Sequence, residues 1–241
     1  MGLMFEKPCY PVFCKAHLSD IGKYHSLRCD SKQFEGRFLE FETLIEKSDV
    51  FFLGDLLPLP LIKGSQPNYI EGAEGIPVIN TLSIQNLRIN IEDCRYISED
   101  DYDSIIEARK LQKNDVLLTM DGGTSIGKPV LFNLDGSYTV DSHIPILRNP
   151  KISEKAWVYL LASPIGQLQF NRAESGASGQ TSVTEEDLRR FRFPTKLLAQ
   201  IDALAKELDL ERKKINLERC ELDKREHEAW EQFSLKCLCN S

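Results

Sequence analysis

The sequence lacks the features that identify a membrane protein or a secreted protein. No apolar run approaches the roughly 20 residues that a membrane-spanning helix needs, so we expect no association with a bilayer. The first residues also lack the basic-then-apolar pattern and the small-residue cleavage site of a signal peptide. These absences predict a cytoplasmic protein.

Motifs that bind metals or form disulfide frameworks are also missing. The seven cysteines are odd in number and include no C-x-x-C pair, which argues against both a disulfide framework and a zinc site. Cys237 and Cys239 could hold a metal only with ligands from elsewhere in the chain. The four histidines form no H-E-x-x-H motif. We therefore predict no metal and no cofactor.

The motifs of common enzymes are equally scarce. Asp141-Ser142-His143 contains the three residue types of a catalytic triad, but neighbouring residues on a strand point to opposite faces and cannot form a relay. No G-x-S-x-G elbow is present. Pro129 follows Lys128 where a phosphate-binding loop needs Ser or Thr. The sequence therefore predicts a protein without catalytic residues.

An overall excess of basic residues, the usual footprint of a nucleic-acid-binding protein, is absent too. The net charge is −7, from 30 Lys and Arg against 37 Asp and Glu. From Pro194 onward there are 9 basic and 10 acidic residues, which leaves 21 and 27 of those totals in residues 1–193. Any surface for nucleic acid must then be a local patch on an acidic protein.

The part of the chain before Pro194 combines helix and strand patterns. Phe34, Phe38, Phe41 and Ile45 recur at helical spacing and predict a helix with one buried face. Strands are expected at residues 76–80, 116–118, 126–132 and 138–147, with Asp135-Gly136 as a tight hairpin turn between the last two. Because of Pro77, the first of these strands should lie at a sheet edge or have Pro77 at its start.

Further segments are less regular. Residues 83–86 are expected to form a loop or short helix, residues 100–109 a helix, and residues 153–162 a buried helix. Pro164 is expected to break or kink this helix, and a continuation over residues 165–170 stays open. Residues 174–182 carry no large side chain and are read as a linker or as a functional loop.

A heptad pattern begins after Pro194. Apolar residues recur every seven positions, without any Gly or Pro, over a helix of some 44 residues that would extend roughly 65 Å. Such a stripe needs a partner helix. Beyond Leu208 charged residues occupy the alternate heptad positions, so pairing with a second copy and pairing with another protein both stay open. The predicted dimerisation residues are Leu197, Ile201, Leu204, Leu208, Ile215 and Leu222.

These elements predict an α+β fold, in which a β-rich domain of mixed and antiparallel strands spans residues 1–193 and a long coiled-coil helix spans residues 194–241. The order of several short motifs resembles a known family. Residues 62–67, 75–79 and 114–118, followed by Gly122, resemble a target recognition domain, the DNA-reading part of type I restriction–modification specificity subunits. Residues 179–182 and Phe193-Pro194, just before the long helix, are similar to the passage from that domain into the family's spacer helix.

The resemblance implies a non-catalytic subunit that binds double-stranded DNA and an adenine methyltransferase subunit, and in some systems a restriction subunit with translocase and nuclease activity. S-adenosylmethionine and magnesium would then belong to the partners. A full specificity subunit carries two recognition domains and two spacer helices, whereas this chain has one of each. It therefore resembles a half-subunit that dimerises through antiparallel helices and reads a symmetric, two-part DNA site.

Polar loops supply the candidate DNA contacts, because Asn, Gln, Arg, Lys, Ser and Thr read base edges and hold phosphates. For each candidate a purely structural role in a turn or cap is the competing reading, and His143 fits a partly buried hydrogen-bonding residue. The candidates are Lys63, Ser65, Gln66, Asn68, Tyr69, Asn80, Asn86, Gly122, Thr124, Ser125, Lys128, His143, Arg172, Ser178, Gln180, Thr181 and Ser182.

A second function from a different class fits the acidic charge. The chain would then be a non-enzymatic coiled-coil module that binds a protein or peptide and has no DNA target. A third hypothesis is a recognition domain that has lost its target. DNA binding by a complex of the chain with its partners separates the first function from the second.

Overall fold

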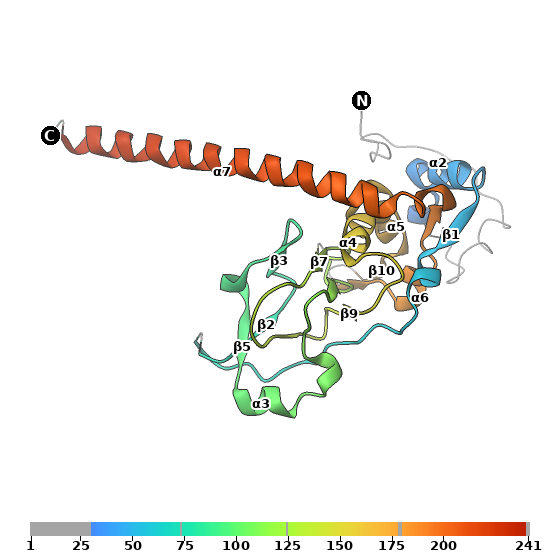
Figure 1. Cartoon of the computed structure of the whole chain (residues 1–241), viewed down its shortest axis with the longest axis horizontal. Coiled ribbons are helices and arrows are strands. Elements are labelled where there is room, and N and C mark those ends of the chain that lie inside the picture. The colour runs from blue at the N-terminus through green and yellow to red at the C-terminus, as the bar shows by residue number, and fades with distance from the viewer. Residues whose placement is uncertain (1–29, 73, 124, 178–179, 240–241) are drawn as a thin grey trace. The chain divides into compact units, whose positions relative to one another are not determined.

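The structure is a computed structural model that describes residues 30–72, 74–123, 125–177 and 180–239. The chain forms two compact units, Met1–Ala199 and Gln200–Ser241. The second unit consists of a single helix, which runs without a break in Figure 1. Within the described part of the chain, every helix is too short or too polar to cross a bilayer.

The first unit contains most of the helices. Its α-helices are α2 (Gly36–Ile45), α3 (Glu99–Ser104), α4 (Glu154–Ala162), α5 (Pro164–Ala173) and α6 (Glu185–Arg189). Its 3-10 helices are η1 (Ser31–Phe34), η2 (Leu53–Leu56), η3 (Ile91–Asp93), η4 (Glu107–Arg109) and η5 (Thr195–Leu197). The second unit holds α7 (Ile201–Cys239).

The strands are short and form five small sheets. They are β1 (Val50–Phe52), β2 (Ile76–Ile79), β3 (Ile84–Gln85), β4 (Arg88–Ile89), β5 (Arg95–Ile97), β6 (Val116–Leu118), β7 (Pro129–Leu131), β8 (Thr139–Val140), β9 (Ile146–Leu147), β10 (Ser175–Ala177), β11 (Gln180–Ser182) and β12 (Arg192–Pro194). Two sheets have three strands, in the orders β5-β2-β8 and β7-β6-β9, and the pairs β1-β12, β3-β4 and β10-β11 form the others. Among the strand pairs of the described residues, the β2-β8 pair alone is parallel. The predicted α+β class with mixed and antiparallel strands and a long C-terminal helix is confirmed.

One hydrophobic core joins the two three-stranded sheets. Ile79 of β2 and Val140 of β8 belong to the same buried cluster as Leu117 of β6, Val130 of β7 and Ile146 of β9. Burial of large aliphatic side chains stabilises a fold by about 1.5–3 kcal/mol for each residue. This cluster therefore fixes the sheets as one support for the loops that leave them.

A second core lies under α2. Phe38, Phe41 and Ile45 are buried and pack with Leu168 of α5. The helical spacing of these side chains in the sequence predicts this face, and the structure agrees. Helix α5 begins with Pro164 at its first position, where the Ser163 hydroxyl accepts a hydrogen bond from the Gly166 N–H at 3.1 Å. Pro164 thus starts a new helix instead of continuing α4, because proline is tolerated only in the first turn.

The stretch of chain between residues 50 and 194 begins and ends at two paired strands, β1 and β12. These strands pair antiparallel with Val50 opposite Pro194 and Phe51 opposite Phe193. The rings of Phe51 and Phe193 stack at 5.8 Å, and both side chains are buried. The long stretch between the two strands is therefore closed at its base.

The predicted hairpin around Asp135-Gly136 is wrong in its pairing. The segment expected as one return strand is split into β8 and β9 by a turn at residues 141–145. Strand β8 pairs with β2 in the other sheet, and β9 pairs with β6. The apolar run alone could not reveal the split, because both halves are buried and differ only in their partners.

Other boundaries also differ from the sequence reading. The expected helix at 100–109 is divided into α3 and η4, and residues 83–86 belong mainly to the β3-β4 hairpin. Within residues 174–182, β10 pairs antiparallel with β11. Pro77 does lie near the start of its strand, but β2 is a central strand, which is possible because β8 pairs only with Val78 and Ile79.

The long helix begins later than predicted. Pro194 still belongs to β12, and residues 195–197 form the 3-10 turn η5, so α7 starts at Ile201. Leu197 therefore lies outside the helix, which is a correction to its place in the heptad stripe. Ile201 is buried within this chain, whereas the next stripe residues are exposed.

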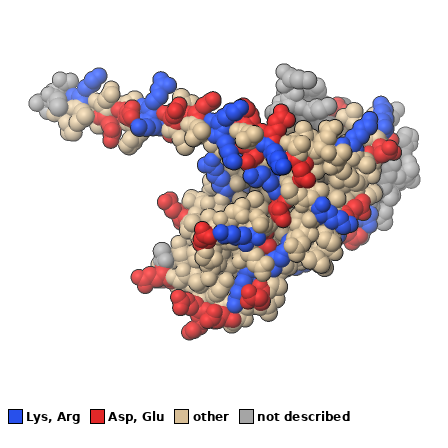
Figure 2. Space-filling view, viewed as in Figure 1, with Lys and Arg blue, Asp and Glu red and all other residues tan. Residues whose placement is uncertain are grey.

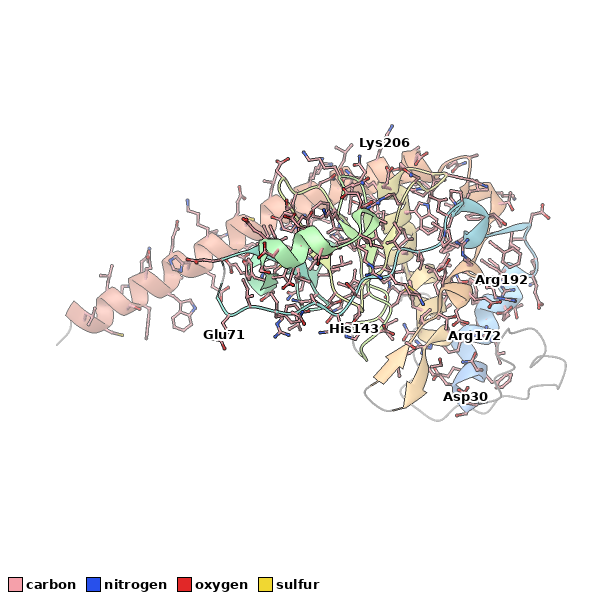
Figure 3. The ribbon with its side chains drawn as sticks, turned by 90° about the horizontal axis from the view of Figure 1, so that it is seen from below. Asp30, Glu71, His143, Arg172, Arg192 and Lys206 are labelled. Carbon is pink, nitrogen blue, oxygen red and sulfur yellow. The ribbon has the colours of Figure 1, made fainter. Side chains whose placement is uncertain are left out.

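A buried ion-pair cluster connects α2, α5 and β12. The Glu42 carboxylate is 2.6 Å from the Arg172 guanidinium and 2.5 Å from that of Arg192. Arg172 also donates a hydrogen bond to the Gln33 carbonyl at 3.0 Å, and the Gln33 amide donates to the Arg172 carbonyl at 2.8 Å. Figure 3 shows Arg172 and Arg192 beside α2. The prediction that Arg172 contacts DNA is therefore wrong, because its side chain is buried and is committed to Glu42.

The Glu42→Gln variant tests this cluster. Loss of the carboxylate leaves two guanidinium groups without their shared counter-charge, and removal of one partner of a buried ion pair costs about 3–5 kcal/mol. We expect a decrease of this size in the free energy of unfolding measured with urea. The matched control is Glu186→Gln, which removes the half-exposed pair with Arg190 and should cost less than about 1 kcal/mol. Equal effects of the two substitutions would contradict the structural role of Glu42.

Candidate nucleic-acid interface

The loop at residues 63–69 rests on the turn that follows β8. A Cβ added to Gly64 would lie 1.8 Å from the Asp141 carbonyl oxygen, so the two backbones touch. The Ser142 hydroxyl donates a hydrogen bond to the Gln66 side chain at 3.3 Å. Ile62 exchanges two backbone hydrogen bonds with Ile146, at 2.9 and 3.0 Å. The first predicted loop is thereby held against the Asp141–His143 turn.

The loop at residues 121–128 rests on the β10-β11 hairpin. The Gly122 N–H donates to the Thr181 carbonyl at 3.1 Å, and Asp121 forms a β-bridge with Ser182. Gly122 has a φ of 98°, which glycine adopts without strain. The Met120 N–H donates to the His143 carbonyl at 3.2 Å. Four polar segments, at residues 63–69, 121–123 with 125–128, 141–143, and 175–177 with 180–182, therefore form one continuous group, which we call the loop cluster.

His143 lies at the centre of the loop cluster. Its ring is half-exposed, and its Nδ1 atom is 3.6 Å from the Asp121 carboxylate. The His143 backbone N–H donates to the Asp141 side chain at 2.9 Å. Burial raises the pKa of the Asp141 carboxyl, while this hydrogen bond and the nearby His143 ring act in the opposite direction. Figure 3 labels His143 on the face turned toward the viewer.

Tyr69 and Arg95 form a stacked pair at one side of the loop cluster. The guanidinium carbon of Arg95 lies 3.7 Å from the centre of the Tyr69 ring. Burial raises the pKa of the Tyr69 hydroxyl, the charge of Asp141 raises it further, and Arg95 lowers it. Arg95 is not among the DNA contacts predicted from the sequence, because nothing in the sequence distinguishes one basic residue of a short strand from any other. Its position depends on the pairing of β5 with β2.

The predicted site residues separate into two groups. Those in the loop cluster are exposed or half-buried: Lys63, Ser65, Gln66, Asn68, Tyr69, Gly122, Ser125, Lys128, His143, Thr181 and Ser182. The backbone N–H of Lys128 donates a hydrogen bond to the Thr119 hydroxyl at 2.9 Å. Gln180 belongs to β11, and Thr124 and Ser178 lie outside the described residues.

Two asparagines have structural roles in addition to Arg172. Asn80 is buried, and its side-chain oxygen accepts hydrogen bonds from the N–H groups of Leu82 and Ser83 at 2.8 and 3.2 Å. The prediction that Asn80 contacts DNA is therefore wrong. Asn86 has a φ of 50° in the turn between β3 and β4, which asparagine tolerates better than most residues. It is exposed, but the hydrogen bonds that join the loop cluster do not include it.

The cations around the loop cluster differ from most others in the first unit. Lys63, Arg95 and Lys128 have no carboxylate within ion-pair distance among the described residues, whereas Lys32, Arg189 and Arg190, for example, are paired with glutamates. Figure 2 shows basic and acidic side chains mixed over the surface, in agreement with the net charge of −7. Within its four segments the loop cluster has Lys63 and Lys128 against Asp121 and Asp141, and Arg95 adds one positive charge beside them, so it contains cations without ion-pair partners but no large excess of basic residues. Such groups can bind anions without first breaking an ion pair.

The loop cluster offers the chemical groups of a binding surface. Within the described part of the chain, no group of three or more His, Cys, Asp and Glu side chains could hold a metal ion. The cluster offers amide, hydroxyl and cationic groups on loops that a packed core supports. These are the groups that contact the bases and phosphates of nucleic acids.

The Gly64→Ala variant tests the contact between the first loop and the turn after β8. Because the added methyl group meets backbone atoms, the loop must move away from Asp141. We expect the free energy of unfolding to decrease by about 1–3 kcal/mol, as in other overpacked sites. The control is Gly36→Ala, where an added Cβ meets nothing within 4 Å. If both variants unfold at the same urea concentration as the original protein, the close approach at Gly64 is wrong.

The chain is similar to three solved structures that concern type I restriction–modification systems. One comes from work on the complex assembly and conformational transition of such a system, with 16% identity, a TM-score of 0.46, and coverage of 82% of this chain and 50% of that one. The others are an S subunit from M. genitalium and an HsdS subunit from Thermoanaerobacter tengcongensis. Each is 16% identical to this chain, and each match covers 68% of this chain. The TM-score is 0.45 for the S subunit, of which 39% is covered, and 0.44 for the HsdS subunit, of which 37% is covered. This chain thus spans half or less of each of these structures. No curated protein matches the chain.

The family comparison covers most of the first unit and less than half of the second. The model of the type I restriction modification DNA specificity domain matches residues 45–217, from the end of α2 through the loop cluster and into α7. The match includes all four segments of the cluster and the paired strands β1 and β12 at its base. The chain therefore belongs to the family of type I restriction–modification DNA specificity domains.

Proposed function

We propose that this chain is the DNA-reading component of a type I restriction–modification system and that it carries no catalytic residue itself. The observation that supports this most directly is the loop cluster. Four polar segments are tied together by hydrogen bonds, and three cations beside them lack carboxylate partners among the described residues. Local positive charge on an otherwise acidic protein is what a specific DNA surface needs.

The side chains of the loop cluster have two expected tasks. Lys63, Arg95 and Lys128 contact phosphates, which sets the position of the domain on the duplex. Gln66 and Asn68 are exposed polar groups that contact base edges in the major groove, where amide side chains form paired hydrogen bonds with adenine. His143 is close enough to Asp121 that its ring orientation depends on that carboxylate.

On this proposal the chain works with other subunits. Its partners are an adenine methyltransferase subunit and, in a complete system, a restriction subunit with translocase and nuclease activity. S-adenosylmethionine and magnesium belong to those partners. The family match supports this role, and the chain itself binds double-stranded DNA without a cofactor.

The proposed DNA site has two halves. The stripe residues Leu204, Leu208 and Ile215 are exposed at 43%, 45% and 39%, and Leu222 at 57%. Exposed apolar side chains at heptad spacing favour pairing with another helix. A dimer of identical chains would present two recognition domains and read the same sequence in each half-site.

An alternative function rests on the same exposed helix. The acidic net charge and the apolar stripe of α7 fit a coiled-coil module that binds proteins and has no DNA target. The two functions differ in what the cell loses when the gene is deleted.

The experiment that separates them is methylome sequencing before and after deletion of the gene, with recovery of the tagged chain and its partners from the same cells. Loss of adenine methylation at one bipartite sequence, together with recovery of an adenine methyltransferase subunit, supports the proposal. An unchanged methylome and partners unrelated to DNA modification would favour the alternative.

Substitution of Lys63, Arg95 and Lys128 by Ala tests the phosphate contacts. Each lost phosphate contact should reduce the slope of log affinity against log salt by about 0.9. We expect weaker binding of the assembled complex to every DNA sequence, measured by fluorescence anisotropy over a range of salt concentrations. The control is Lys113→Ala, whose ammonium group is paired with Asp135 at 2.6 Å and should leave the slope unchanged. An effect confined to one sequence would mean that the three cations read bases instead.

A further inference from the structure

The apolar side chains on one face of α7 follow a mirror-symmetric order. The intervals between successive members of this stripe are 4, 7, 7, 7 and 4 residues, so the pattern is the same when read from either end. All six members are exposed along the helix. The members are Leu204, Leu208, Ile215, Leu222, Ala229 and Phe233.

Helix geometry places these residues on one face. Leu204 and Leu222 are 18 positions apart, as are Ile215 and Phe233, and 18 residues make about five full turns at 3.6 residues per turn. Trp230 packs edge-on against Phe233, with ring centres 5.9 Å apart and planes at 87°. The two rings, exposed at 62% and 58%, extend the stripe well beyond Leu222.

We propose that a second copy of this chain pairs with α7 in the antiparallel direction and in one register, with the midpoint between Glu218 and Arg219. This inference deepens the dimer of the proposed function, on which it rests, by naming the facing residues. In this register Leu204 faces Phe233 of the second copy, Leu208 faces Ala229, and Ile215 faces Leu222. Trp230 of the second copy covers the same end as Phe233, beside Leu208.

Neighbouring registers lose this match. A shift by one heptad in one direction places Leu204 opposite Glu226, and a shift in the other direction places Leu208 opposite Lys236. Each of these registers would bury a charged residue against an apolar side chain, which is costly without a partner. Of these three registers, only the proposed one pairs every member of the stripe with another member, although it also places Ile201, which is buried within its own chain, level with Lys236.

Charged residues beside the stripe favour the same register. Glu211 and Arg225 flank one side of the stripe, and Arg212 and Glu226 flank the other. In an antiparallel pair each flank faces its own equivalent, so Glu211 lies near Arg225 of the second copy, and Arg212 near Glu226. At the midpoint the two copies contribute two glutamates and two arginines, which neutralise one another. Polar groups inside an apolar seam commonly fix the register of paired helices.

The register also uses almost the whole helix. Ile201 of one copy lies level with Lys236 of the other, so residues 201–236 overlap over about 54 Å at 1.5 Å per residue. The exposed face would otherwise leave a long line of apolar side chains in water. A second copy covers that line from end to end.

Charge reversal tests the register without DNA. Arg212→Glu and Glu226→Arg each create two like-charge contacts in a homodimer, and we expect the dimer dissociation constant of each variant to rise about tenfold, since exposed ion pairs are individually weak. An equimolar mixture of the two variants regains both opposite-charge contacts in the mixed dimer. The mixture should therefore restore the original dissociation constant, measured by analytical ultracentrifugation of the full chain.

Two controls distinguish the register from general effects on the helix. Lys224→Glu lies nine positions from Ile215, about two and a half turns and so on the opposite face, and it should not change the dissociation constant. Leu217→Asp removes an exposed leucine off the stripe, whereas Leu222→Asp removes one within it, at 69% and 57% exposure. Only Leu222→Asp should weaken the dimer, and circular dichroism of the variants checks that α7 still forms.

The outcomes decide between separate ideas. Restoration in the mixture supports the antiparallel register, because a parallel pair without an offset places Arg212 beside Arg212 of the second copy and Glu226 beside Glu226. Weakened variants that the mixture does not restore would overturn the register, and so would a chain that stays monomeric. Because these measurements use no DNA, a failed register with an intact sequence-specific methylome would leave the DNA-reading function in place.

Discussion

The pairing of β1 with β12 is the constraint on which the recognition unit depends. Phe51 and Phe193 are far apart in the sequence, yet they stack in the same buried layer. The adjacent Arg192 forms an ion pair with Glu42 of α2, which connects β12 to that helix. Everything between the two strands is a long excursion that starts and ends at one place. A loop surface can carry precise contacts only when its ends are fixed in this way.

Support from beneath allows polar segments to meet at the surface. The shared core of the two three-stranded sheets supports β2, β6 and β9. Three segments of the loop cluster precede β2, follow β6 and precede β9 along the chain, whereas the fourth contains β10 and β11 and follows α5. Main-chain hydrogen bonds between the segments leave the side chains of Lys63 and Gln66 exposed. Backbone hydrogen bonds and a few side-chain contacts, such as that of Ser142 with Gln66, hold the loops, and exposed side chains such as that of Lys63 remain for a ligand.

The sequence predicts much of the fold but less of the site. The helix at α2 follows from the spacing of its phenylalanines, and β6 follows from a short apolar run, because local periodicity carries both signals. Strand partners are a long-range property, so the division of residues 138–147 between two sheets was not predictable from periodicity. The same reason explains why Arg172 and Asn80 were misassigned. Both are polar residues among other polar residues in the sequence. Only the folded chain reveals that Arg172 pairs with Glu42 and that the Asn80 side chain accepts a hydrogen bond from the Ser83 N–H.

The close contact between Gly64 and Asp141 has a consequence for how such a domain changes over evolutionary time. The backbone at residue 64 leaves no space for any side chain, whereas Gln66 and Asn68, two and four positions later, project into solvent. Mutations at the exposed positions alter the chemistry of the surface while the loop path stays the same. A mutation at the glycine instead shifts the whole loop and every side chain on it. The fold thus separates sites where variation is cheap from a neighbouring site where it is not, and new binding preferences can arise without a new scaffold.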